Sequence, residues 1–543
     1  MAKLHFPRKL IEQNLKLDNS TIADLSLFGT PLESLTDEEV ELEISANRPD
    51  LLSAYGFLRA FQAYKGKKTG LKKYTVAHDH RPNYTVILDK RVKSCPRPHT
   101  VCAVVKNLSL TDATLKEMIQ LQEKLALTLG RQRRKFGIGV YPLEKINFPA
   151  RYEARKPADI EFIPLGFTKP MNAHQILQKH PMGKAYAHLL NGAERFPIFT
   201  DAKKQILSLL PIINSQDTGH VTTQTKDIFV ECSGNDLITI NAALSIFVTF
   251  CAEIGGTIEA VEMRGDKKYI APDLKAKTIK LNKKTLEQTL GITLAEKEIA
   301  QLLARMGHDY KKGIVAYGCW RTDVLHEVDI IEDIAIAYGY DKFTPLLPEV
   351  PGVGEEAFES KANIKIVEAL MGLGFLETSS LHFITAEEKG KGKAEHSIEV
   401  ENPRTEYAYL RPNLLIPTLR TLAHNLHAEY PQKICETGIV FSQNFAQIKE
   451  ERHLIIAHTP ANFTIIKQAL DYLFRILNLN YELKETQVGG FIDGRTASVI
   501  LEGREIGFMG ELHPSTLREW KLKMPLAVAE IDLTNIYERL RDK

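Results

Sequence analysis

Residues 320–343, WRTDVLHEVDIIEDIAIAYGYDKF, combine an apolar stripe with a dense group of carboxylates. Apolar side chains recur there at spacings of three and four, the period of a helix that buries one face: Val328, Ile331, Ala335 and Tyr338. Four acids stand near the start of the same segment: Asp323, Asp329, Glu332 and Asp333. The segment predicts a helix that packs into a core, and the role of its carboxylates has to be explained separately.

On a helix, Asp329, Glu332 and Asp333 share one face, because residues three and four apart are neighbours, and Asp323 precedes them on the approach. Converging carboxylates repel each other unless water screens them or a hard cation such as Mg²⁺ or Ca²⁺ binds their oxygens. Acids in the first turn of a helix are also favoured by the helix dipole. The spacing leaves two interpretations open, a solvated helix start and a cation site.

The composition is typical of a multidomain globular protein. With 543 residues the chain is too long for one core and predicts three or four domains, and its apolar fraction of 44% is ordinary. Its 70 basic and 68 acidic residues give a formal charge of +2, so any RNA contact requires local basic patches. The six cysteines include no C-x-x-C pair, which argues against a zinc ribbon. Without a long apolar run or a signal peptide, the sequence predicts a cytoplasmic protein with no membrane span.

Outward from this segment, the signals predict a multidomain fold of α/β and α+β type. The expected units are a small N-terminal α/β unit at 1–75, a larger region at 76–265, a compact unit at 270–345 and a final domain at 355–543. TPLLPEVPGVG, with three prolines and two glycines, marks the boundary before the last domain. In the first unit Val40, Leu42 and Ile44 alternate as one face of a strand, and Asp50 is predicted to cap the next helix.

Motifs for self-contained catalysis are missing from the sequence. It contains no phosphate-binding G-x-x-x-x-G-K-[ST], no G-x-S-x-G and no H-E-x-x-H. Two basic segments, KGKKTGLKK at 65–73 and RQRRK at 131–135, have the side chains that contact phosphates, and both also suit a solvated linker or turn. Motif chemistry alone therefore predicts no reaction.

Six stretches, in this order along the chain, resemble one family. They are SANRPDLLSAYG (45–56), LLPIINSQDTGHVTTQTKDIFVECSGND (209–236), the opening segment, ENPRTEYAYLRPNLLIPTLRTLAHN (401–425), PQKICETGIVF (431–441) and GFMGELHPSTLREWKL (507–522). Together they resemble the β subunit of phenylalanine–tRNA ligase of the archaeal/eukaryotic type, a class II aminoacyl-tRNA synthetase complex. The resemblance extends over nearly the whole chain.

The resemblance implies a division of labour in an α₂β₂ heterotetramer. The α subunit uses ATP to attach phenylalanine to tRNA(Phe), and the last domain of β is a degenerate class II synthetase-like antiparallel-sheet domain. The sequence agrees, because Arg518 lacks the Gly-rich context of an ATP-binding motif, and Arg411 is interpreted as a structural or interface residue. The resemblance also implies a B1-like unit at 1–75 and a B5-like unit at 270–345.

Two sites follow from the resemblance. Family positions for a Mg²⁺ site at the contact with the α subunit match Asp323, Asp329, Glu332 and Asp333. The region 76–265 resembles the B3/B4 domain that hydrolyses mischarged Tyr-tRNA(Phe). Its candidate residues are Ser208, Glu231 and Ser233, with Arg133 and Arg134 for the end of the tRNA. A site that hydrogen-bonds the tyrosine hydroxyl would reject phenylalanine, which leaves the polar group unpaired. Here Glu231 and Ser233 replace the frequent Asp and Thr, and Pro142 replaces an acid.

Two further hypotheses remain, a stand-alone aminoacyl-tRNA deacylase that uses region 76–265, and an RNA-binding regulatory protein. A trans-acting deacylase would need only the middle region, and a regulator would not need an intact synthetase-like last domain. This chain has both the middle region and the synthetase-like last domain, which favours the synthetase subunit.

Overall fold

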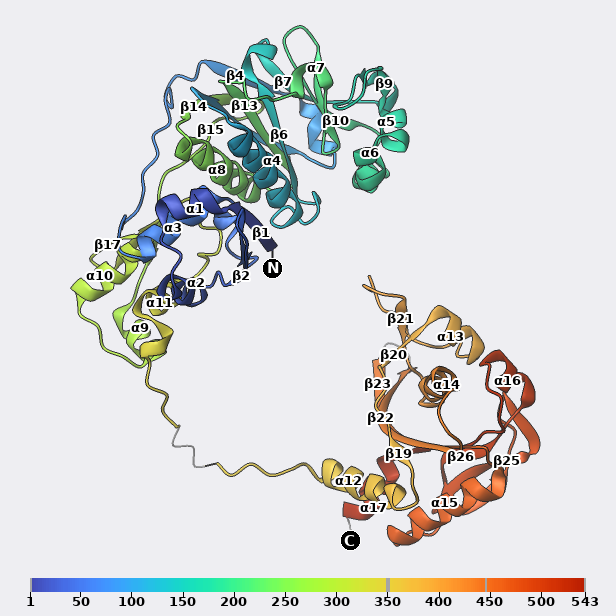
Figure 1. Cartoon of the computed structure of the whole chain (residues 1–543). Coiled ribbons are helices and arrows are strands. Elements are labelled where there is room, and N and C mark those ends of the chain that lie inside the picture. Colours follow the sequence, from blue (N-terminus) through green and yellow to red (C-terminus); the bar gives the residue numbers. More distant parts are fainter. Residues whose placement is uncertain (1, 348–351, 445–446, 542–543) are drawn as a thin grey trace. The chain divides into compact units, whose positions relative to one another are not determined.

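The chain folds into two compact units in the computed structural model, which describes residues 2–347, 352–444 and 447–541 (Figure 1). Unit 1 is Met1–Leu346 and unit 2 is Leu347–Lys543. The division falls inside the Pro- and Gly-rich segment that was predicted as a boundary, of which residues 348–351 lie outside the described part. Among the described helices, none has both the length and the apolarity to cross a membrane.

The N-terminal module of unit 1 is a three-stranded antiparallel sheet, in the order β1-β3-β2, with three helices. Its elements are β1 (Ala2–Pro7), α1 (Arg8–Asn14), α2 (Asn19–Phe28), β2 (Leu32–Leu35), β3 (Glu39–Ile44) and α3 (Ala54–Tyr64). The predicted face of Val40, Leu42 and Ile44 is fully buried. The predicted cap is wrong, because Ser53 accepts the Gly56 N–H at 3.0 Å and begins the helix. Asp50 instead receives two hydrogen bonds from the guanidinium of Arg48.

The middle module contains a ten-stranded mixed sheet in the order β12-β11-β10-β7-β4-β14-β5-β13-β6, with β15 paired to β14. Its strands are β4 (Tyr84–Leu88), β5 (His99–Lys106), β6 (Phe136–Pro142), β7 (Ala150–Arg155), β10 (Phe196–Thr200), β11 (Ile206–Leu209), β12 (Ile213–Asn214), β13 (Ile228–Gly234), β14 (Thr257–Arg264) and β15 (Lys268–Ala271). A small lobe of β8 (Glu161–Phe162), β9 (Met171–Asn172), α5 (Ala173–Lys179) and α6 (Pro181–Tyr186) is inserted between β7 and β10, and α7 (Gln216–Gly219) follows β12.

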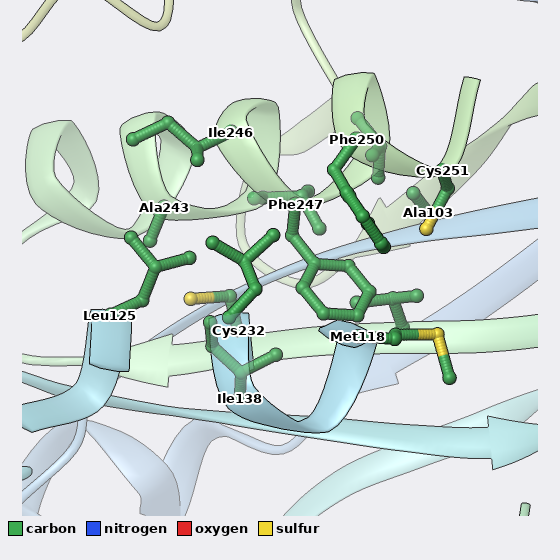
Figure 2. Close-up of a cluster of buried hydrophobic side chains, with 14 of the residues drawn as sticks. Ala103, Met118, Leu125, Ile138, Cys232, Ala243, Ile246, Phe247, Phe250 and Cys251 are labelled. Carbon is green, nitrogen blue, oxygen red and sulfur yellow. The ribbon is translucent and has the colours of Figure 1, made fainter. Parts of the chain in front are cut away.

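Two helices, α4 (Asp112–Leu127) and α8 (Leu237–Glu253), pack on this sheet. Figure 2 shows Phe247 and Phe250 of α8 beside Met118 of α4 and Ile138 and Cys232 of the strands. Helix α8 is apolar over most of its surface, as expected for a helix buried between a sheet and other elements. This core fixes the strands that carry the polar site below.

The third module joins a three-stranded sheet, in the order β16-β18-β17, to three helices. Its elements are β16 (Lys277–Lys280), α9 (Lys283–Leu290), α10 (Glu296–Arg305), β17 (Asp309–Lys311), β18 (Ile314–Tyr317) and α11 (Glu327–Tyr338). The predicted stripe on α11 is partly wrong, because Val328 is 48% exposed, whereas Ile330 and Ile334 are fully buried. One of the four acids lies inside the module, since Asp333 is only 3% exposed.

Unit 2 is a seven-stranded sheet in the order β19-β22-β23-β27-β26-β25-β24, antiparallel except for the pair β19–β22. The strands are β19 (Leu376–Glu377), β22 (Gln432–Asn444), β23 (Gln447–Thr459), β24 (Glu482–Glu485), β25 (Phe491–Leu501), β26 (Arg504–Leu512) and β27 (Ala527–Asp532). Helices α12 (Phe358–Met371), α15 (Phe463–Ile476) and α17 (Thr534–Arg541) cover one face. The other face packs on α14 (Leu415–His424), and nearby are β20 (Phe383–Thr385), β21 (Tyr407–Leu410), α13 (Ala386–Lys391) and α16 (Pro514–Glu519).

Arg411, which follows β21, has the structural role predicted for it. Its buried guanidinium donates to the Glu436 carboxylate, the Ile439 carbonyl and the Ser380 hydroxyl, each at 2.8 Å. The side chain is therefore part of the interior of unit 2.

Candidate functional site

A cavity of about 600 Å³ opens in the middle module beside strands β6, β11 and β13. Its lining is mostly apolar, with a few polar groups that include Glu231, Asn214, Gln122 and Arg133. Mostly apolar walls with a few placed polar groups are typical of a small-molecule site.

Strand pairing brings the polar groups to one place. Glu231 on β13 lies opposite Gly139 on β6, and Ser233, two residues further, points to the same side of the sheet as Glu231. Glycine at position 139 leaves room for both side chains, because a Cβ there would lie 2.4 Å from the Tyr141 hydroxyl and 2.5 Å from the Glu231 Oε1. The close approach of β6 to the carboxyl group therefore depends on a missing side chain.

Glu231 is fully buried and hydrogen-bonded at its second oxygen. The Ser233 hydroxyl donates to Oε2 at 2.5 Å, and the Thr100 hydroxyl lies 2.8 Å from the Ser233 Oγ. Burial raises the pKa of the Glu231 carboxyl to about 7, although the Ser233 hydrogen bond and the charge of Arg97 act in the opposite direction. The carboxyl therefore keeps its proton to a higher pH than an exposed glutamate does, and in the protonated form it can both donate and accept a hydrogen bond.

Tyr141 on β6 connects Glu231 to Ser208. Its hydroxyl donates to the Ser208 Oγ at 2.8 Å, and it lies 3.3 Å from the Asn214 Oδ1 and 3.5 Å from the Glu231 Oε1. Of the predicted residues, Ser208, Glu231 and Ser233 are therefore brought together. Tyr141 and Asn214 were missed, although the alternation of FGIGVY places Tyr141 on the same strand face as Gly139.

The two predicted arginines differ in position. Arg133 lines the cavity, and its guanidinium donates to the carbonyls of Pro211 and Ile212 at 2.9 and 3.1 Å while covering the ring of Tyr186. Arg134 is exposed and does not line the cavity. Arg133 thus forms part of the cavity wall, and Arg134 lies outside the cavity.

At the acidic segment, Arg321 binds two of the four carboxylates. Its guanidinium nitrogens lie 2.7 Å from the Asp323 Oδ2 and 2.7 Å from the Asp333 Oδ2, and the His308 Nε2 is also 2.7 Å from the latter oxygen. Burial alone would raise the pKa of Asp333, but Arg321 and His308 hold it well below its usual range. Arg321 and His308 were not predicted, although the spacing in WRTD places Arg321 two residues before Asp323.

The other two acids differ in environment. The Asp329 carboxylate accepts the Leu325 and His326 N–H groups at 2.7 and 2.6 Å and caps helix α11. Partial burial raises the pKa of Glu332, and the charges of Asp333, Asp329 and Asp323 raise it further. The four carboxylates therefore interact electrostatically, as the helical spacing suggested.

The acids fit a hard cation in chemistry, because all four supply oxygen and outnumber the single guanidinium among them. In geometry, no group of three or more His, Cys, Asp or Glu side chains in the described part of the chain is close enough to hold a metal. Glu332 forms no ion pair among the described residues, so it is the acid most available to a cation.

Two family models match parts of an aminoacyl-tRNA synthetase. Residues 279–340 match the tRNA synthetase B5 domain, and residues 344–533 match the phenylalanyl tRNA synthetase beta chain CLM domain. The chain is 36% identical to the phenylalanine–tRNA ligase β subunit of Thermococcus onnurineus, with 95% of each chain covered, and 34% identical to that of Archaeoglobus fulgidus, with 97% covered. The chain belongs to the family of phenylalanine–tRNA ligase β subunits.

A solved structure agrees with this assignment. An N-terminal fragment of the phenylalanyl-tRNA synthetase β subunit from Pyrococcus horikoshii superimposes with a TM-score of 0.58 at 34% identity, covering 62% of this chain and 99% of the fragment. The predicted fold class and family are confirmed.

Proposed function

We propose that this chain assembles with a catalytic α subunit into an α₂β₂ phenylalanine–tRNA ligase of the cytoplasm, which uses ATP to charge tRNA(Phe). The observation that carries the proposal is the match to β subunits over 95% of the chain. Unit 2 supports a noncatalytic role, because Arg411 is committed to Glu436 inside the domain and Arg518 lies exposed on α16. Because Arg411 is held by Glu436, it is not available to bind the phosphates of ATP.

The test is reconstitution. Purified chain is mixed with a separately purified α subunit, and co-elution on size exclusion and phenylalanylation of tRNA(Phe) are measured. We expect a complex of both chains and activity that neither chain has alone. A chain that never co-elutes and restores no activity would refute the proposal; hydrolysis of Tyr-tRNA(Phe) by the isolated chain would then favour a stand-alone deacylase, and tRNA binding alone a regulator.

We also propose that the cavity at β6, β11 and β13 binds the tyrosyl group of Tyr-tRNA(Phe) for hydrolysis. Glu231, which lines the cavity, accepts the hydroxyl of the tyrosyl group; Ser233 orients the Glu231 carboxyl from behind the wall, Ser208 binds the Tyr141 hydroxyl, and Arg133 forms part of the wall. A phenylalanyl group would leave the Glu231 Oε1 without the hydroxyl that a tyrosyl group supplies, a loss that gives strong discrimination. Water then attacks the ester carbonyl, and the bond to the ribose oxygen breaks to release tyrosine and free tRNA.

The experiment measures deacylation of Tyr-tRNA(Phe) by the assembled enzyme. We expect Glu231→Ala to lower the rate about 100-fold, because the buried acceptor for the hydroxyl is lost. The control is Glu144→Ala, which removes an exposed acid just after β6 and should leave the rate unchanged. Equal rates for wild type and Glu231→Ala would refute this assignment, and phenylalanylation measured in parallel shows whether each variant still assembles.

For the acidic segment we propose that Asp323, Asp329, Glu332 and Asp333 bind Mg²⁺ in the assembled enzyme, which requires Asp323 and Asp333 to exchange the Arg321 guanidinium for the ion. A bound Mg²⁺ would supply charge neutralisation at the joint between subunits rather than ligation chemistry. Titration with Mn²⁺, followed by electron paramagnetic resonance, tests this proposal on the assembled enzyme. Glu332→Ala should weaken binding about tenfold, and Glu296→Ala in the same module should not. Equal Mn²⁺ affinities of the two variants would refute the cation site and favour the interpretation of the acids as a solvated helix start.

A further inference from the structure

A second cavity, of about 420 Å³, lies within unit 1 where α3, the linker 65–74 and the third module meet. None of the residues assigned to ligation or editing lines it. Five cationic side chains, Arg48, Arg59, Lys68, Lys72 and Arg321, face it, against the two carboxylates of Asp50 and Glu253. Its size falls in the range of small-molecule sites.

Most of these charges are paired, and two are not. Asp50 is held by Arg48 at 2.9 Å, and Glu253 by Lys72 at 2.7 Å. Arg321 is paired with Asp323 and Asp333, each at 2.7 Å. Within the described residues, Arg59 and Lys68 form no ion pair, so the cavity has an excess of positive charge.

Arg59 is oriented by uncharged groups. Its guanidinium lies 4.5 Å from the ring centroid of Trp320 and donates to the Tyr74 hydroxyl at 3.0 Å. A guanidinium fixed by an aromatic face and one hydroxyl keeps further N–H groups for an acceptor, and it suits phosphate oxygens because of its planar fork.

The linker KGKKTG, residues 65–70, forms part of the wall and is held in place. Gly66 and Gly70 adopt left-handed backbone angles, with φ of +77° and +83°. The Gly70 N–H donates to the Ala304 carbonyl at 2.7 Å, and the Leu71 N–H donates to the Asp309 Oδ1 at 3.0 Å. Lys68 and Thr69 are thereby presented to the cavity by an anchored loop rather than by a free tail.

We propose that this cavity binds a phosphate ester, with Arg59 and Lys68 as the direct ligands. A solvated basic linker would explain Lys68 alone. It does not explain why Lys68, on an anchored loop, and Arg59, with an oriented guanidinium, line the same cavity and both lack an ion pair among the described residues. The phosphate belongs either to a free nucleotide or to the backbone of an RNA chain. The proposal is independent of the editing reaction, because no residue of the first cavity takes part.

The chain has a built-in reporter for the test. It contains two tryptophans, and Trp320 lines this cavity. Trp520 lies buried in unit 2, and its indole N–H has no hydrogen-bond partner among the described residues, so Trp520→Phe removes only ring contacts. In the full-length Trp520→Phe chain, the emission of Trp320 is followed during titration with inorganic diphosphate, AMP and tRNA, each at low and high salt.

We expect a saturable change in emission that weakens with salt, as for any binding based on charge. Lys68→Glu should weaken the binding about tenfold, the value of one charge-assisted contact. The control Lys169→Glu changes an exposed lysine remote in sequence from the linker, and its affinity for the probes should stay close to that of the Trp520→Phe parent. A response to diphosphate and AMP assigns the phosphate to a free nucleotide, and a response to tRNA alone assigns it to RNA. No saturable response to any probe, or equal affinities for the two variants, would overturn the proposal.

Discussion

Glu117 on α4 provides a direct test of how the modules of unit 1 are joined. Its side chain is 7% exposed, and its carboxyl accepts the Ala54 N–H at 2.6 Å, at the start of α3 in the N-terminal module. Burial raises the pKa of this carboxyl from 4.5 to about 7, although the backbone N–H groups of Ala54 and Tyr55 act in the opposite direction. The folded protein therefore favours the protonated form.

The size of the effect follows from this difference. A pKa of about 7 when folded against 4.5 when unfolded corresponds to about 3 kcal/mol. Because the folded pKa is the higher one, the stabilisation from this group is fully present below pH 4.5 and is lost as the pH rises through 7. Glu117→Gln keeps an acceptor for the Ala54 N–H but cannot ionise.

The free energy of unfolding of wild type and Glu117→Gln should thus be nearly equal at pH 4.5 and differ by about 3 kcal/mol at pH 8.5, with the variant more stable. Urea titrations in the Trp520→Phe background measure this, because Trp320 then reports unit 1 alone. Subtracting one free energy of unfolding from the other removes the contribution of the other titrating groups, because these groups are the same in both proteins. A difference that does not change with pH, or a variant that is less stable at pH 8.5, would refute the reasoning.

Four further substitutions test the packing. Gly139→Ala should slow Tyr-tRNA(Phe) deacylation and destabilise unit 1 by about 1–3 kcal/mol, because its Cβ would collide with the Tyr141 hydroxyl and the Glu231 carboxyl; rates and urea midpoints that match wild type would contradict this. Arg411→Met should destabilise unit 2 by about 3–5 kcal/mol, measured by Trp520 emission in urea, because it leaves the buried Glu436 carboxylate with Ser380 as a hydrogen-bond donor but without a countercharge. Ile334→Ala should cost about 2–5 kcal/mol and Val328→Ala less than about 0.5 kcal/mol in unit 1, and a reversed order would restore the stripe predicted from the sequence.

Elements with a strong local period could be predicted from the sequence alone. The alternation of Val40, Leu42 and Ile44 identified a half-buried strand, because this pattern depends only on neighbours along the chain. The segment 320–343 was harder, since its apolar residues allow more than one helical face. Packing against other elements buries Ile330 and Ile334 and leaves Val328 exposed, and periodicity alone could not make that choice.

Side-chain partnerships across elements limited the prediction of the sites. An aspartate before a helix is usually read as a cap, and only the position of Arg48 in three dimensions shows that Asp50 is its ion-pair partner instead. Ser208 and Glu231 were found as members of a resembling motif. Tyr141, which lies between them, comes from a strand about 70 residues earlier than Ser208, and its role depends on strand order.

Sequence signals divide the first 345 residues into three segments, yet these pack as one compact unit, and specific hydrogen bonds explain why. Glu117 of the middle module binds the backbone of α3 in the N-terminal module. Arg305 of the third module donates to the Tyr64 carbonyl at 2.8 Å and to the Ala337 carbonyl at 2.5 Å, so it connects the end of α3 to α11. A buried donor or acceptor that loses its partner pays a full desolvation penalty, so each contact favours this one arrangement of modules over any other. The cationic cavity lies at this joint, and its shape therefore depends on the same contacts that Glu117→Gln will probe.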